Sequence, residues 1–106
     1  EMVLQAFGAC LSIGYAMNAA VRGININDIK IDLEGEIDLP GFLGLEAPEN
    51  LNMAKLPGFK NITVNVKIKS SADRKTLEDL HRHVIGTSPV GVTLSRPVAI
   101  QTTLVA

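Results

Sequence analysis

The chain opens with a long uncharged stretch that predicts a helix. Between Glu1 and Arg22 no residue is charged, so the stretch runs over the twenty residues of Met2–Val21. Alanine, leucine and methionine favour helix, and Gly23 suits the residue just beyond a helix end. The pattern therefore predicts one helix over Met2–Val21.

This predicted helix is apolar on nearly every side. Fifteen of its twenty residues are apolar or aromatic, and the exceptions are Gln5, Gly8, Ser12, Gly14 and Asn18. Such a helix is normally buried, and at about 1.5 Å per residue it would be roughly 30 Å long. It could be covered by lipid, by the rest of the chain or by a second copy. Because Gln5 and Asn18 are costly in lipid and no basic start suggests a signal peptide, we expect a soluble, intertwined homodimer and no membrane partner.

Two later stretches alternate between apolar and polar residues and predict strands. They are Ile29–Ile37 and Ile62–Ile68, and the apolar row of the first consists of Ile29, Ile31, Leu33, Gly35 and Ile37. Such alternation is typical of an antiparallel sheet with one buried face. Gly35 in that row predicts a bulge or close packing against the helix. Between the strands, Leu39 to Phe59 is apolar but interrupted by turns, which predicts a pocket wall or a cover for the sheet edge.

The remainder predicts two helices and a strand. Ser70–Ser71 offer an N-cap, with Asp73 in the first turn, for a helix that ends near Gly86. Its inner stripe consists of Leu77, Leu80 and Val84. Ser88 followed by Pro89 predicts a short helix through Leu94, and alternation predicts a final strand over Val98–Leu104.

The order of these elements predicts an α+β fold with a long central helix packed on an antiparallel sheet. We expect a single domain over residues 1–106. The chain opens inside a helix, and three strands make a poor sheet for so long a helix. We therefore expect that N-terminal antiparallel strands are absent from this chain.

Charge and cysteine content exclude several classes of partner. The net charge is −1, with ten basic and eleven acidic residues that form no blocks, so we expect neither nucleic acid nor an anionic membrane as a partner. The single cysteine excludes an intrachain disulfide and favours a reducing cytoplasm.

Cys10, at the middle of the predicted helix, is the candidate reactive group. Small residues lie one turn away at Ala6 and Gly14, and Phe7 and Met17 could line an apolar cavity beside the sulfur. A thiol in apolar surroundings becomes nucleophilic only with a nearby cation, a helix N-terminus or hydrogen bonds. Cysteine also serves often as a small buried hydrophobe. Spacing alone leaves a structural and a reactive Cys10 both open, with the structural role favoured.

Other candidate chemistry is weaker. His81 and His83 are two residues apart and so point in different directions on a helix, which predicts solvent-facing residues rather than a metal site. Gly8, Ser12 and Gly14 form no phosphate loop, because no strand precedes them, and instead suit close helix packing. A hydrolytic serine would need a histidine partner that the sequence does not indicate. We expect no cofactor and no metal.

Taken together, these features resemble the osmotically inducible protein C (OsmC) and organic hydroperoxide resistance family. The resemblance covers essentially the whole chain through the order and spacing of Glu1, Leu4, Ala6, Gly8–Cys10, Gly35–Asp38, Gly41, Pro57–Phe59, Ser88–Val90, Leu94 and Pro97–Val98. It implies an intertwined homodimer with active sites at the subunit boundary. It also implies that Cys10 attacks an organic hydroperoxide and becomes a sulfenic acid.

The family further implies partners for that cysteine. A second cysteine, placed before a proline, closes a disulfide that dithiols reopen. A glutamate upstream on the helix, which Glu1 resembles at nine residues before Cys10, and an arginine from N-terminal strands hold the thiolate. In the hydroperoxide-resistance branch the glutamate stands nearer ten residues before the cysteine.

This chain departs from the family at two points. Ser88 occupies the resolving-cysteine position and cannot form a disulfide, and nothing matches the arginine-bearing segment. The resemblance therefore implies a peroxidase that is weak, inactive or dependent on an external thiol, with a substrate pocket at Phe7, Met17 and Pro89. The alternative is a non-catalytic dimer of the same fold that binds an apolar ligand or is purely structural.

Overall fold

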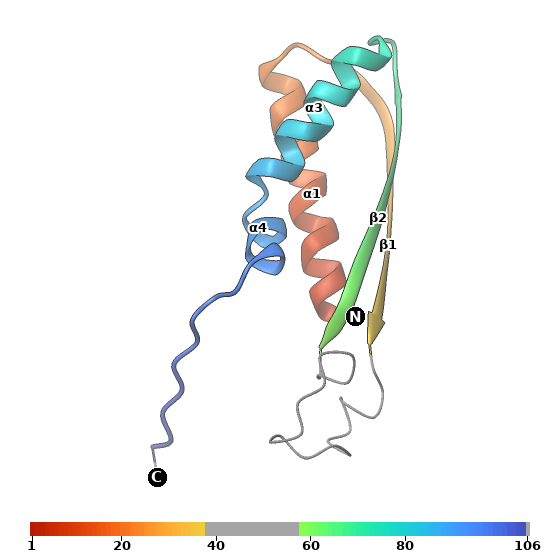
Figure 1. The fold of residues 1–106 in the computed structure, drawn as a ribbon. Helices are drawn as coiled ribbons and strands as arrows, with labels where there is room; N and C mark the ends of the chain where they lie inside the picture. The colour runs from red at the N-terminus through yellow and green to blue at the C-terminus, as the bar shows by residue number, and fades with distance from the viewer. Residues whose placement is uncertain (38–57, 106) are drawn as a thin grey trace.

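The computed structural model describes residues 1–37 and 58–105. In chain order its elements are α1 (Met2–Val21), β1 (Ile26–Ile37), β2 (Phe59–Ser70), α3 (Arg74–Thr87) and α4 (Pro89–Ser95). The helices lie on one side of the two-stranded sheet (Figure 1). This arrangement is the α+β fold with an antiparallel sheet that the sequence predicts. Most of the predicted irregular segment, residues 39–57, lies outside the described residues.

The two strands pair antiparallel in a register that places their apolar residues on one face. The pairs that carry this face are Ile29 with Ile68, Ile31 with Val66, and Leu33 with Val64. Each strand is longer than its alternating stretch, because β1 begins at Ile26 and β2 begins at Phe59. The apolar row of β1 is shorter than predicted, since Ile37 at the strand end is 47% exposed.

Gly35 has a different role from either of those predicted. It pairs with Ile62 within the regular part of the register, so it is not a bulge. A β-carbon at this position would clash with the ring of Phe59 on the neighbouring strand. The glycine therefore makes room for an aromatic ring of β2 and not for the helix.

The core forms where one stripe of α1 meets α3 and the sheet. Phe7, Leu11, Tyr15 and Ala19, each four residues apart, are buried against Leu80 and Val84 of α3. A β-carbon at Gly14 would lie 3.0 Å from Cγ1 of Val84, so this glycine lets the two helices approach closely. The small-residue interpretation is thereby confirmed at Gly14.

The other sides of α1 stay exposed within this single chain. Ile13 is 61% exposed and Met17 is 65% exposed, so the described residues bury one stripe of a helix that is apolar nearly all round. Among the described helices α1 alone is long and apolar enough to cross a membrane by length and composition. The core helix of a soluble protein passes the same test, and α1 carries the buried core described above.

The start of α3 differs from the prediction, whereas the start of α4 agrees with it. Asp73 caps α3, because its Oδ1 accepts a hydrogen bond from the Thr76 N–H at 2.9 Å. Ser70 instead donates its hydroxyl to the carbonyl of Asn25 at 2.6 Å, which ties the end of β2 to the start of the hairpin. Ser88 caps α4 as predicted, and Pro89 is its first residue.

The prediction of a final strand over Val98–Leu104 is wrong. Residues 97–105 adopt no strand, and the alternating side chains are exposed, with Ile100 at 82% and Leu104 at 93%. Figure 1 shows this segment, in dark blue, leading away from the helices and the sheet. Alternation describes only the chain itself, whereas a strand also needs a neighbouring edge to pair with.

Candidate functional site

Cys10 faces the junction between α3 and α4. Its side chain is half-buried, and its Sγ lies 3.2 Å from Oγ of Ser88. Ser88 is the C-cap of α3 and the N-cap of α4, and it is only 5% exposed. The contact joins residues 78 positions apart, so the packing of α1 against this junction creates it.

Ser88 is held in place by the backbone of α4. The N–H of Gly91 donates a hydrogen bond to Ser88 Oγ at 3.1 Å, which is the usual geometry of a serine N-cap. The β-carbon that Gly91 lacks would lie 3.0 Å from the Phe7 ring, so α4 packs closely on α1 at this level. The sulfur therefore faces a hydroxyl that is fixed by two helices.

Glu1 does not reach Cys10 within the chain. It is the N-cap residue of α1 and its side chain makes no capping hydrogen bond. Nine residues at about 1.5 Å each place it roughly 13 Å along the axis, and 3.6 residues per turn place it on the opposite side of the helix. The role that the resemblance gives to Glu1 stays a prediction.

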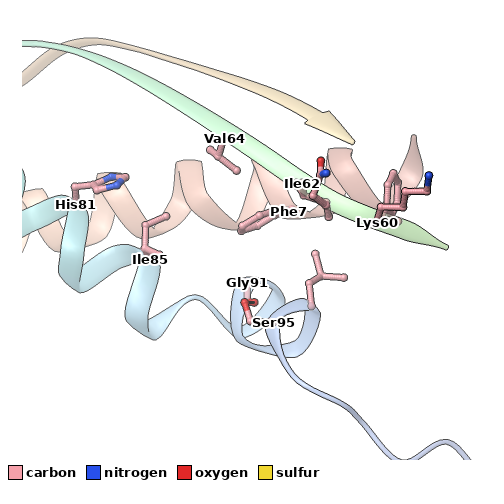
Figure 2. Close-up of a pocket in the computed structure, with 11 residues that line it drawn as sticks. Phe7, Lys60, Ile62, Val64, His81, Ile85, Gly91 and Ser95 are labelled. Atoms are coloured by element: carbon pink, nitrogen blue, oxygen red, sulfur yellow. Dashed lines mark hydrogen bonds between the residues drawn. The ribbon is translucent and has the colours of Figure 1, made fainter. Parts of the chain in front are cut away.

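A cavity of about 580 Å³ lies between α1, β2, α3 and α4 (Figure 2). Phe7, one of the predicted pocket residues, lines it together with Ile62, Val64 and Ile85. Met17 and Pro89, the other two predicted pocket residues, are not among its lining residues, and neither is Cys10.

The start of α4 links the cavity to the cysteine. Gly91 lines the cavity and also donates its N–H to Ser88, which in turn contacts Cys10. Cys10 is thus connected to the cavity through Ser88 and Gly91, although it does not line the cavity itself.

Tyr15 and His81 form a second polar contact, which the sequence interpretation missed. The Tyr15 side chain is fully buried, its hydroxyl hydrogen-bonds with Nδ1 of His81, and the rings stack with centroids 6.1 Å apart. Burial raises the pKa of Tyr15 to about 12. His81 is exposed, as expected, but it also ties α3 to α1 through Tyr15 and lines the cavity.

Helical spacing could have indicated this role. His81 follows Leu77 by four residues and precedes Val84 by three, so it lies at the border of the inner stripe of α3, within reach of α1. No group of three or more histidine, cysteine, aspartate or glutamate side chains suited to a metal ion occurs within residues 1–37 and 58–105.

Comparisons with known proteins give a family and a fold. The sequence model of the family described as OsmC-like protein matches residues 1–103. No curated protein matches the chain significantly. A solved structure, the OsmC-like protein from Mycoplasma pneumoniae, matches with a TM-score of 0.71 at 17% identity.

That alignment covers 89% of this chain and 59% of the Mycoplasma chain, so this chain spans less than two thirds of its structural neighbour. At this identity the similarity shows the fold alone. The family match is independent of the structure and extends over all five described elements. Sequence and fold agree, and the chain belongs to the OsmC-like protein family.

Proposed function

We propose that this protein is a thiol-dependent peroxidase that reduces organic hydroperoxides with Cys10 as the reacting sulfur. The observation that carries the proposal is the 3.2 Å contact between Cys10 Sγ and Ser88 Oγ. The resemblance matches these two positions to the reacting and resolving cysteines of the family. Two cysteines that form a disulfide must be neighbours in the fold, and Cys10 and Ser88 are neighbours.

The proposed reaction begins with the Cys10 thiolate. Its sulfur attacks the terminal oxygen of the hydroperoxide, a new S–O bond forms, and the O–O bond breaks with its electron pair leaving on the alkoxide. The alkoxide takes up a proton to become an alcohol. Cys10 is oxidised to a sulfenic acid, and the hydroperoxide is reduced by two electrons.

An external thiol completes the proposed cycle, because Ser88 has no sulfur with which to form a disulfide. One thiol condenses with the sulfenic acid, which releases water and leaves a mixed disulfide on Cys10. A second thiol attacks that disulfide, restores the Cys10 thiol and departs as the oxidised reductant. A dithiol would supply both steps from one molecule.

We further propose that the working form is a single-domain homodimer in the cytoplasm, without a nucleic-acid or membrane partner. Exposed apolar side chains on α1, such as Ile13 and Met17, support this form, because a second copy would cover them. The exposed alternating segment after α4 supports intertwining, since it could pair with a strand edge of the other copy.

A second candidate function is binding of an apolar ligand without catalysis. The specific observation in its favour is the 580 Å³ cavity, whose lining includes Phe7 and Ile62 but not Cys10. In this hypothesis Cys10 is a packing residue and the family's chemistry has been lost. Retention of a ligand by a variant that lacks the sulfur would favour it.

An assay of hydroperoxide consumption tests the leading proposal. Cumene hydroperoxide is supplied with dithiothreitol, and the unchanged chain is compared with Cys10→Ser. We expect consumption by the former and only the background rate with the latter. Ser12→Ala is a matched control, since its exposed hydroxyl bonds to the carbonyl of Gly8 on the same helix. Absence of consumption by the unchanged chain would contradict the peroxidase proposal.

A further inference from the structure

The hydroxyl of Ser88 has two hydrogen-bond partners, the N–H of Gly91 and the sulfur of Cys10. The first partner decides which role the hydroxyl can take toward the second. The backbone N–H of Gly91 can only donate, so it occupies a lone pair on Ser88 Oγ at 3.1 Å. The hydroxyl proton of Ser88 therefore remains available to be donated to another acceptor. Within the described residues, the other atom in hydrogen-bond reach of this oxygen is Cys10 Sγ at 3.2 Å.

The protonation state of Cys10 then fixes the direction of this bond. A neutral thiol and a hydroxyl can each act as donor, but a thiolate can only accept. Ser88 is 5% exposed, so water has little access to replace its proton as the donor. A hydrogen bond to a charged acceptor is stronger than a neutral one, so the contact favours the ionised sulfur over the neutral sulfur.

We infer that Ser88 is a further catalytic residue of this site, whose hydroxyl donates to the Cys10 thiolate and keeps it nucleophilic. This role of Ser88 rests on the proposed peroxidase function, in which Cys10 is the reacting sulfur. The serine that removes disulfide chemistry from the cycle thereby supplies a different support to the same sulfur. No cation is needed for this contribution.

Alkylation of Cys10 by iodoacetamide tests the inference without any peroxide. Cys10 is the one cysteine of the chain, so the rate reports on it alone. We expect Ser88→Ala to alkylate about tenfold more slowly at neutral pH, because a hydrogen bond to a charged group is lost. We also expect its rate profile to shift to higher pH and to converge with the unchanged chain where the thiol is fully ionised.

Two further variants separate the proton of Ser88 from its role as a helix cap. Ser88→Thr keeps a hydroxyl and should keep the unchanged pH profile. Asp73→Ala removes the N-cap of α3, a bond of 2.9 Å to the Thr76 N–H, and should lower stability without moving the profile. A merely structural role for Ser88 would give the same result in Ser88→Ala and Asp73→Ala.

Ser88→Gly provides the same comparison if the alanine variant does not fold, because glycine is tolerated at N-cap positions. The inference is overturned if folded Ser88→Ala or Ser88→Gly alkylates at the unchanged rate across the pH range. Failure of the peroxidase proposal looks different: the pH profile would shift as expected, yet the unchanged chain would consume no hydroperoxide.

Discussion

At the scale of single residues, the site depends on a pair that no local pattern connects. Cys10 comes from the middle of α1, and Ser88 from the link between α3 and α4. Serine preserves the cap that starts α4, which cysteine would fill less well, so one residue has both a structural and a chemical role. The pair Tyr15 and His81 connects α1 to α3, about one and a half turns beyond Cys10 along α1.

Replacing Ser88 with cysteine should restore a two-cysteine cycle. The Oγ atom lies 3.2 Å from Cys10 Sγ, so a sulfur at this place needs little movement to form a bond. We expect one equivalent of hydroperoxide to give a chain that has lost two hydrogens by mass and has no free thiol. Thr87→Cys, at the neighbouring exposed position, is the matched control and should form no disulfide with Cys10. Free thiols in oxidised Ser88→Cys would show that the two side chains are not neighbours.

The Tyr15 hydroxyl should titrate far above its ordinary value. Its pKa is raised from 10.0 to about 12 by burial, and the absorbance of tyrosinate reports it directly because the chain has one tyrosine and no tryptophan. The fold favours the neutral phenol, so its contribution to stability is present below pH 10 and is lost as the pH rises from 10 towards 12.

Tyr15→Phe provides the control for this titration. It should cost about 1 kcal/mol of unfolding free energy at neutral pH, because the hydrogen bond to His81 is lost. It should also remove the part of the alkaline decline that the unchanged chain shows in urea unfolding. A native titration midpoint near 10 would contradict the buried position of the ring.

At the scale of elements, periodicity predicted helices and strands well and their neighbours poorly. The uncharged run gave α1 with its bounds, and alternation gave β1 and β2, because these patterns reflect the period of one element. The same alternation wrongly predicted a third strand over Val98–Leu104, because a strand also needs a partner edge. The cap of α3 was misplaced, since serine and aspartate residues compete for one position. The pair Cys10 and Ser88 became an expectation only through the family resemblance. Its contact depends on three helices packing together, which no single period records.

Two glycines test the packing between elements, with opposite expected signs. Gly35→Ala should destabilise the chain by roughly 1–3 kcal/mol, because its β-carbon would clash with the Phe59 ring. Gly86→Ala should stabilise it by up to about 1 kcal/mol, since Gly86 lies within α3 and nothing is within 4 Å of the added atom. Urea unfolding of both variants measures the difference. Equal effects would contradict the packing of Phe59 over Gly35.

At the scale of the whole molecule, the described residues bury only one side of the central helix α1. The buried stripe of α1 meets the sheet and α3, while Val3, Ile13 and Met17 are 41%, 61% and 65% exposed. Apolar side chains exposed in a row along one helix are typical of an interface. The homodimer proposed above would bury them and enclose the half-buried Cys10 at the same time.

A charge introduced on the exposed apolar side of α1 should dissociate the proposed dimer into single chains. Light scattering should give twice the 11.3 kDa of one chain for the unchanged protein. Ile13→Asp should shift the mass towards a single chain, because an unpaired carboxylate in an apolar interface is costly. Lys30→Asp, on the polar face of β1, is the charge-change control and should leave the mass unchanged. A single-chain mass for the unchanged protein would exclude the dimer.

Reaction of Cys10 with an organic hydroperoxide adds oxygen to the sulfur, so intact-mass spectrometry detects it on the chain itself. The reduced protein is treated with one equivalent of cumene hydroperoxide, and dimedone is added to trap any sulfenic acid as an adduct. We predict the adduct on Cys10 in the unchanged chain and no adduct on Cys10→Ser. An unchanged mass after treatment, with the fold intact, would show that Cys10 is not a peroxidatic residue.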